Sequence, residues 1–280
     1  MKETINDKIE LKAEKNIEYL KELLQDNSDM IFRTFNVGKW EASLVYIDGM
    51  ADKLLLDHYV LEPLMLAANE IEDVEEIKDN VLAVTDMREV KKMSEGVNAA
   101  LSGDTLMFID GLDCAYVIAS RSWPARGVGD PSGETVIRGA REGFTETIRF
   151  NTALIRRRIR DTRLRIKRKT LGTRSKTDVV IMYIDDIVNK GVLDELEHRI
   201  DKINIDAVFD SAYIEQLIED NKYSPFPQIQ STERPDVVAA ALYEGRVALL
   251  VDNSPFAIIV PATLPNLFQS PDDYYQRWMH

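Results

Sequence analysis

The chain has 280 residues, about twice the usual length of one domain, and 45% of its residues are apolar and 30% charged. This ordinary globular composition excludes disordered, collagen-like and low-complexity chains. The net charge of −13 opposes contact with nucleic acid or anionic lipid over most of the surface, and a single cysteine, Cys114, excludes an internal disulfide.

The N-terminal third is predicted to begin with helices and a strand. Apolar residues at spacings of three and four predict one amphipathic helix over 1–30. A strand is predicted at 42–48. A second helix is predicted over 51–68, with a break at Glu62-Pro63, because proline lacks the N–H that a helix interior needs.

A short helix near 73–80 and a strand at 81–85 are predicted next. Asp86 then fits the N-cap of a further helix, because Glu89 follows three residues later as in a capping box. Gly103 would end this helix, since glycine is favoured just past a helix C-terminus.

The middle of the chain combines a hairpin with a long helix. Two apolar runs, 106–110 and 115–119, predict a β-hairpin. Residues 124–133 are rich in glycine and proline and are expected to form a loop. A long helix is predicted over 134–160, and alternating apolar and basic residues then predict a strand over 163–169.

Strands and helices alternate from residue 171 onward, which favours an α/β sheet. The predicted strands are 179–184, 207–209, 247–251 and 256–260, and the predicted helices are 193–203, 211–220 and 235–244. Pro235 suits the first turn of the last helix, and Gly245 its end.

The expected fold class is therefore α/β, with two α/β subdomains joined by a long helix and linker, each with a small mixed sheet. The predicted division is an N-terminal helix at 1–30, a first subdomain at 31–135, a connecting helix and basic strand at 136–169, a second subdomain at 170–268 and a tail at 269–280.

Side chains for catalysis or metal binding are sparse. The three histidines, His58, His198 and His280, are far apart and lack metal-ligand spacing. No Gly-x-Ser-x-Gly elbow occurs. The loop 126–133 lacks the third glycine of a dinucleotide site and the P-loop lysine, so a connector is favoured over a phosphate site. We therefore expect no enzyme activity, metal or other cofactor.

The main anomaly of the sequence is a cluster of basic residues. Nine Lys and Arg residues occur between Arg156 and Lys169, against one acid. No aromatic residue is interleaved for base stacking, so nucleic-acid binding is not expected. The cations of 163–169 instead fall on one face of a strand, where they can pair with the acidic excess elsewhere.

Five ordered motifs resemble the A subunits of bacterial spore germinant receptors. They are RGAREGF at 138–144, NTALIRRRI at 151–159, SPFPQ at 224–228, TERPD at 232–236 and SPDDYY at 270–275. Ala140 stands where the family usually has proline. The resemblance implies two subdomains similar to the lobes of solute-binding proteins, in a region that precedes several membrane helices beyond residue 280.

The resemblance also implies a function in spore germination triggered by nutrients. It implies B and C receptor subunits as partners, self-association of A subunits, and the spore inner membrane as the location, with this domain on the cytoplasmic side. Our candidate interaction or interlobe residues, which lie in two of the motifs, are Asn151, Arg156, Arg157, Arg158, Glu233 and Arg234.

Two functions remain open at this stage. The first is signalling and assembly, in which the domain relays nutrient binding to the membrane part. The alternative is that an interlobe cleft binds a small nutrient itself, such as an amino acid or a sugar. That alternative depends on fold analogy, which is weak support for function.

Overall fold

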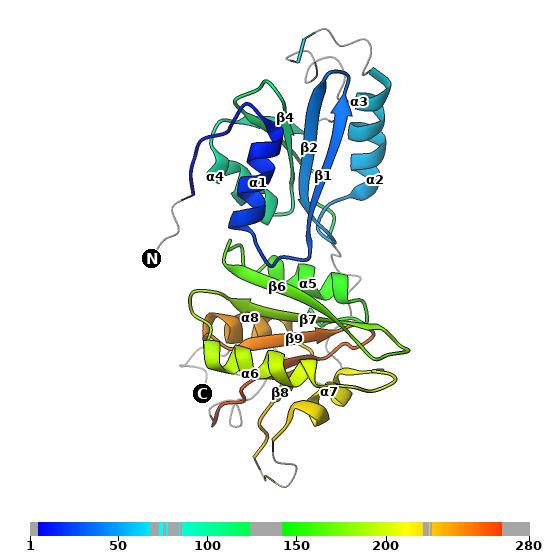
Figure 1. Ribbon diagram of the computed structural model, residues 1–280, viewed down its shortest axis with the longest axis vertical. Coiled ribbons are helices and arrows are strands. Elements are labelled where there is room, and N and C mark those ends of the chain that lie inside the picture. Colours follow the sequence, from blue (N-terminus) through cyan, green and yellow to red (C-terminus); the bar gives the residue numbers. More distant parts are fainter. Residues whose placement is uncertain are drawn as a thin grey trace, which may run out of the picture. The chain divides into compact units, whose positions relative to one another are not determined.

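The computed structural model describes residues 5–67, 73–74, 77, 84, 86–123, 142–220, 224 and 226–264. The chain divides into two compact units, one of residues 1–123 with 160–162 and one of residues 124–159 with 163–280 (Figure 1). Each unit holds a five-stranded sheet with helices, so the predicted α/β class with two subdomains is confirmed. Every pairing between the described strands is antiparallel, whereas mixed sheets were expected.

The sheet of the first unit has the order β1-β2-β4-β5-β3. Its strands are β1 (Met30–Val37), β2 (Trp40–Ile47), β3 (Met87–Val90), β4 (Thr105–Ile109) and β5 (Ala115–Ile118). The hairpin predicted at 106–110 and 115–119 is confirmed as β4 and β5. The strand β1, which was not predicted, pairs along its whole length with β2.

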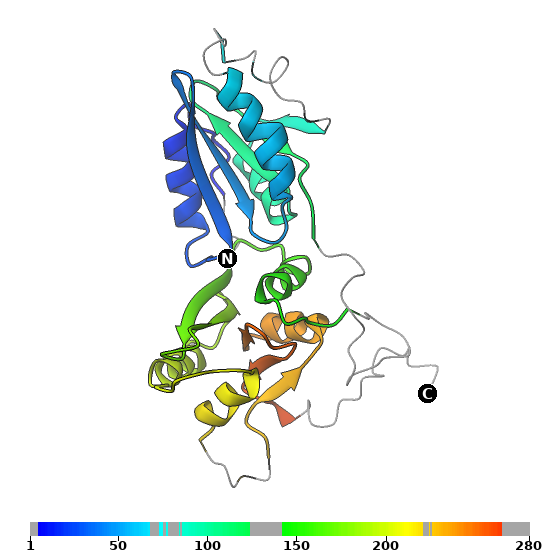
Figure 2. The same cartoon turned by 90° about the vertical axis from the view of Figure 1, so that its right-hand side faces the viewer.

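Helices cover both faces of this first sheet (Figure 2). They are α1 (Ala13–Leu23), α4 (Met93–Leu101) and a continuous helical segment made of α2 (Lys53–Leu55), η1 (Leu56–Leu61) and α3 (Glu62–Leu66). Leu56, Val60 and Leu64 of this segment share one core cluster with Leu44 and Met107 of the sheet. The helix changes from π to α at Glu62, so Pro63 lies in the first turn of α3, where proline is tolerated. The helical segment therefore continues through the predicted break.

Two helix predictions in this unit are wrong at their ends. The N-terminal helix covers 13–23 rather than 1–30, because the Asn16 side chain bonds the backbone N–H and C=O of Glu10 and holds the preceding segment outside the helix. The capping box is wrong too, since Glu89 lies in β3. The helix α4 begins only at Met93, where the Asp7 carboxylate accepts a hydrogen bond from Ser94 N.

The second unit is a three-layer sandwich with sheet order β6-β7-β9-β10-β8. Its strands are β6 (Leu164–Leu171), β7 (Thr177–Ile184), β8 (Gln230–Thr232), β9 (Val247–Val251) and β10 (Ala257–Val260). One face packs against α5 (Ile148–Arg156) and α8 (Pro235–Tyr243), and the other against α6 (Lys190–Asp201) and α7 (Ser211–Ile218). Coverage of both faces explains the continuous apolar runs of β7 and β9.

The strands predicted at 179–184, 247–251 and 256–260 share this sheet, as expected. Other predictions fail. Of the helix expected over 134–160, the part that the structure describes contains α5 only, and residues 142–147 are not helical. Residues 207–209 form no strand, and the helix expected over 211–220 is α7, which ends at Ile218 and is capped by Asp210.

The segment 136–169, expected as a connector, contributes α5 and β6 to the layers of the second unit. The predictions for the tail at 269–280 and for the loop at 124–133 lie outside the described residues, as do nearly all residues of 73–80 and 81–85.

Candidate interaction site: an arginine network in the second unit

The segment that precedes α5 is held by the side chain of Asn151. This residue is 1% exposed, and its amide accepts a hydrogen bond from Thr145 N at 2.8 Å and donates one to Thr145 O at 2.6 Å. A buried amide with both groups satisfied fixes the neighbouring backbone in one conformation. Asn151 therefore positions the residues around Glu142 beside the helix.

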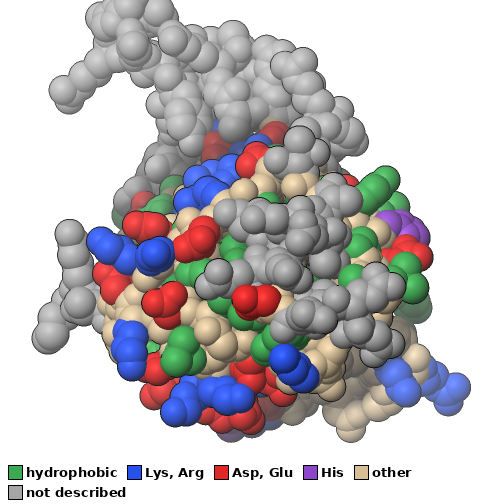
Figure 3. Space-filling view, turned by 90° about the horizontal axis from the view of Figure 1, so that it is seen from above, with side chains coloured by type: hydrophobic (Ala, Val, Ile, Leu, Met, Phe, Trp, Pro, Cys, Tyr) green, Lys and Arg blue, Asp and Glu red, His purple; other side chains and the backbone are tan. Residues whose placement is uncertain are grey.

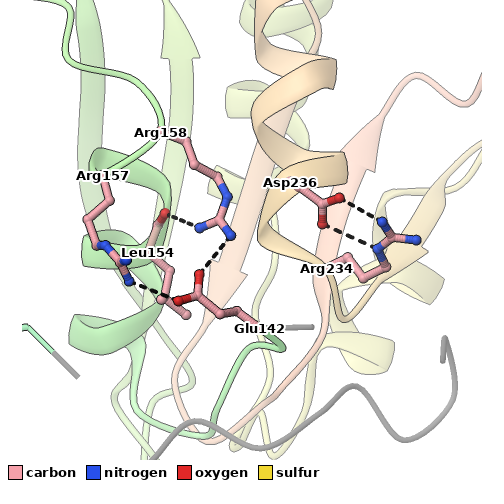
Figure 4. A network of polar contacts seen from close by, with 6 residues as sticks. All are labelled: Glu142, Leu154, Arg157, Arg158, Arg234 and Asp236. Carbon is pink, nitrogen blue, oxygen red and sulfur yellow. Dashed lines mark hydrogen bonds and ion pairs between the residues drawn. The ribbon is translucent and has the colours of Figure 1, made fainter. Parts of the chain in front are cut away.

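Glu142 lies between two of the three consecutive arginines (Figure 4). Arg157 Nη1 donates to Glu142 Oε1 at 3.1 Å, and Arg158 Nη2 donates to Glu142 Oε2 at 2.8 Å. Arg158 Nη1 also donates to Leu154 O at 2.8 Å. Partial burial raises the pKa of Glu142, but the hydrogen bond and charge of Arg158 and the charge of Arg157 outweigh it, so the pKa lies below its ordinary value.

The TERPD motif forms the second half of the network, at the start of α8. Arg234 donates from Nε to Asp236 Oδ1 at 3.2 Å and from Nη2 to Asp236 Oδ2 at 2.6 Å, and its side chain is 3% exposed. Such two-point pairing fixes the guanidinium plane. Asp236 is also the acidic residue in the first turn of α8, where the helix dipole favours negative charge.

A backbone hydrogen bond joins the two halves, because Phe144 N donates to Glu233 O at 2.8 Å. The motif residues at 142–158 and 232–236 therefore meet within one unit, although about 80 residues separate them. We call Glu142, Arg157, Arg158, Arg234 and Asp236 the arginine network (Figure 4).

Arg156 differs from its two neighbours. It is 0% exposed, as are Ile155 and Ile159, whose spacing of four places them on one buried side of the chain. Arg157 and Arg158 remain partly exposed. The three arginines were candidates for interaction or interlobe residues; Arg157 and Arg158 both pair with Glu142, which lies in the same unit. Glu142 and Asp236 were not among the candidate residues, although they lie in two of the five motifs, RGAREGF and TERPD.

The basic strand is neutralised locally. Arg163, just before β6, and the alternating cations on one face of β6 each contact a carboxylate of the same unit: Arg163–Asp186, Arg165–Asp185, Lys167–Glu197 and Lys169–Asp201. The last two acids are four residues apart on α6, a spacing that matches cations two apart on a strand. Lys and Arg side chains are likewise intermixed with Asp and Glu on the face shown in Figure 3.

Two further side chains that could carry chemistry, Cys114 and Asp110, are held in contacts that stabilise the fold. Burial, with the charges of Glu89 and Asp113, raises the pKa of Cys114 to about 11, so the thiol is protonated at neutral pH. Asp110 accepts hydrogen bonds from Lys12 Nζ and Ala13 N. Within the described ranges, no three His, Cys, Asp or Glu side chains are grouped as metal ligands.

None of the helices that the structure describes has the length and apolar character needed to cross a membrane.

Comparison with known proteins gives the family. Residues 18–280 match the model of the Bacillus/Clostridium GerA spore germination protein family. The chain is 41% identical to spore germination protein B1 of Bacillus subtilis over 280 residues, covering 97% of this chain and 57% of that protein. It is 41% identical to the uncharacterized membrane protein YfkQ of Bacillus subtilis over 266 residues, covering 94% and 52%. The chain thus spans about half the length of these curated relatives.

The fold also matches a solved structure. The crystal structure of the N-terminal domain of the A subunit of the Bacillus megaterium spore germinant receptor GerK3 superposes with a TM-score of 0.73 at 32% identity. The match covers 93% of this chain and 99% of that one. The resemblance drawn from the five motifs is therefore confirmed, and the chain belongs to the GerA spore germination protein family.

Proposed function

We propose that this chain is the signalling and assembly region of a spore germinant receptor A subunit, which relays nutrient binding to the part of the protein in the membrane. Membership of the GerA family and the likeness to the N-terminal domain of a receptor A subunit support this proposal. The observation that carries it is the arginine network, because three of the five motifs meet there, one of them about 80 residues from the other two.

The network suits a relay because the Glu142 pairs tie the end of α5 to the segment before it, and the Phe144–Glu233 backbone hydrogen bond ties that segment to the start of α8. Charge-assisted pairs between guanidinium and carboxylate groups fix direction as well as distance. Arg157 and Arg158 are 25% and 21% exposed, so their guanidinium groups are also accessible to a partner. The proposed partners are the B and C subunits and further A subunits, at the spore inner membrane with this domain on the cytoplasmic side. No catalytic step or cofactor is assigned.

The test is to replace Glu142 by Gln in the full-length protein in spores. Two guanidinium groups then lose their shared carboxylate, and we expect a slower response to nutrients at normal receptor abundance, or a receptor that fails to accumulate. The matched control is Glu146→Gln, since Glu146 is exposed in the same segment. Germination and abundance equal to wild type in both variants would overturn the proposal.

Direct nutrient sensing by this domain is the alternative from the sequence. A panel of amino acids and sugars tested by thermal shift on this chain separates the two functions. Stabilisation by a nutrient that also triggers germination would favour direct sensing over a relay.

A further inference from the structure

A groove of about 640 Å³ runs along α6 in the second unit. Its floor is apolar, formed by Leu196, Ile218, Ile229 and Val260, each less than 9% exposed. Volumes of roughly 300–1,000 Å³ with an apolar lining and a few polar groups are typical of small-molecule sites. The groove lies on the face of the sheet that α6 and α7 cover, opposite the helices of the arginine network.

One arginine organises the polar rim of this groove. Arg199 Nε donates to Glu195 Oε1 at 2.7 Å, Arg199 Nη2 lies 2.5 Å from Asp220 Oδ1, and Arg199 Nη1 donates to Ile218 O at 2.5 Å. These contacts tie the end of α7 to α6 and fix the wall of the groove. Each of the three guanidinium nitrogens of Arg199 therefore already has a partner within this chain.

The rim carries an uncompensated negative charge. Glu195 and Asp220 share the single guanidinium of Arg199, and the other described lining residues are neutral. Both carboxylates are more than half exposed and remain open to a ligand. Phe226, which is 63% exposed, also lines the groove, and an aromatic ring is a further contact for a cation.

We propose that this groove binds a small organic cation, with its apolar body on the floor and its ammonium group at the carboxylates of Glu195 and Asp220. An anion of the same shape meets the excess negative charge and is rejected. A neutral molecule of the same shape keeps the apolar contact but lacks the charge interaction, so it binds more weakly.

Three probes with one apolar body test the charge preference: 2-phenylethylamine, 2-phenylethanol and phenylacetate. Each is titrated at low salt into the 280-residue chain, and binding is measured by calorimetry and NMR shifts. We expect the amine to bind at least threefold more tightly than the alcohol, and phenylacetate to bind most weakly. Binding of none of the three, or tightest binding of phenylacetate, would overturn the proposal.

Two matched variants of α6 locate the binding. Glu195→Gln removes the excess charge, so the amine should fall to the affinity of the alcohol while the alcohol is unchanged. Asp194→Asn removes the same charge from the adjacent exposed position, which does not line the groove, and should keep the preference. An unchanged preference in Glu195→Gln would contradict the site. A dimer that Phe226→Ser abolishes, without binding of any probe, would assign the groove to a second copy instead.

Discussion

The Glu142 carboxylate connects two arginines that are adjacent in the sequence. Arg157 is the C-cap residue of α5, and Arg158 follows it in the turn that ends the helix. One carboxylate reaches both, with one oxygen for each guanidinium. Asn151 makes this geometry possible, because it fixes the backbone of the segment that carries Glu142.

This pairing predicts a pH dependence of stability. The folded-state pKa of Glu142 lies below its ordinary value of 4.5, so its contribution is present above that value and is lost as pH falls through the folded pKa. At pH 7 we expect Glu142→Gln to lower the free energy of unfolding by on the order of 1 kcal/mol, since solvent screens the partly exposed pairs. Urea unfolding of both proteins from pH 7 to pH 3 should show this difference shrinking below about pH 4.5. A constant difference would mean that the charge of Glu142 contributes nothing.

At the scale of elements, the ends of the helices are set by contacts beyond their own sequence. The start of α4 is capped by Asp7, from the opposite end of the unit's sequence. The end of α8 depends on Gly245, whose φ of +80° is a conformation that L side chains rarely adopt. A Cβ at this glycine would lie 2.4 Å from the backbone oxygen of Ile187.

We therefore predict opposite results for two glycine variants in the second unit. Gly245→Ala should lower the free energy of unfolding by about 2 kcal/mol or more, because it combines a positive φ with a clash against backbone. Gly191→Ala should be neutral or stabilising by about 0.5 kcal/mol, because Gly191 lies in the first turn of α6 and its nearest neighbour would be 3.5 Å away. Chemical denaturation of both variants checks this, and equal effects would contradict the assigned helix ends.

At the scale of the whole molecule, the chain is acidic, and its basic segment at 163–169 is compensated by nearby carboxylates. The chain carries 35 Lys and Arg against 48 Asp and Glu. Its most basic segment faces the acids of α6 and of the turn after β7. For Lys167, partial burial lowers the pKa, but hydrogen bonds to Tyr183 and Glu197 outweigh it, so the pKa is raised and the side chain stays charged.

This compensation predicts that the basic segment does not bind nucleic acid. We expect no change in the fluorescence anisotropy of a labelled DNA duplex at micromolar protein and about 0.15 M salt. Replacing Glu197 and Asp201 by Gln and Asn releases Lys167 and Lys169, and serves as a control that can only increase binding. Salt-dependent binding by the wild-type chain would contradict the prediction.

Local patterns determined much of the second unit. The runs at 179–184, 247–251 and 256–260 are apolar on both strand faces. This pattern is typical of strands that helices cover on both sides of a sheet. Pro235 and Gly245 marked the limits of α8, because proline suits a first turn and glycine tolerates positive φ. The basic alternation at 163–169 predicted a strand with its cations on one face, and β6 has that arrangement. The five motifs were sufficient to name the family.

Tertiary contacts decided the rest. The helix predicted over 1–30 shortened to α1 because a side chain holds residue 10 outside it, and the capping box at Asp86 gave way to β3 because that segment pairs with β5. The sequence contained Glu142 and Asp236 but no signal that they pair with the arginines. Glu142 lies 15 and 16 positions from its arginines, and the backbone bond between Phe144 and Glu233 joins segments about 80 positions apart. Both contacts depend on which segments the sheet and helices bring together, and sequence spacing does not encode that.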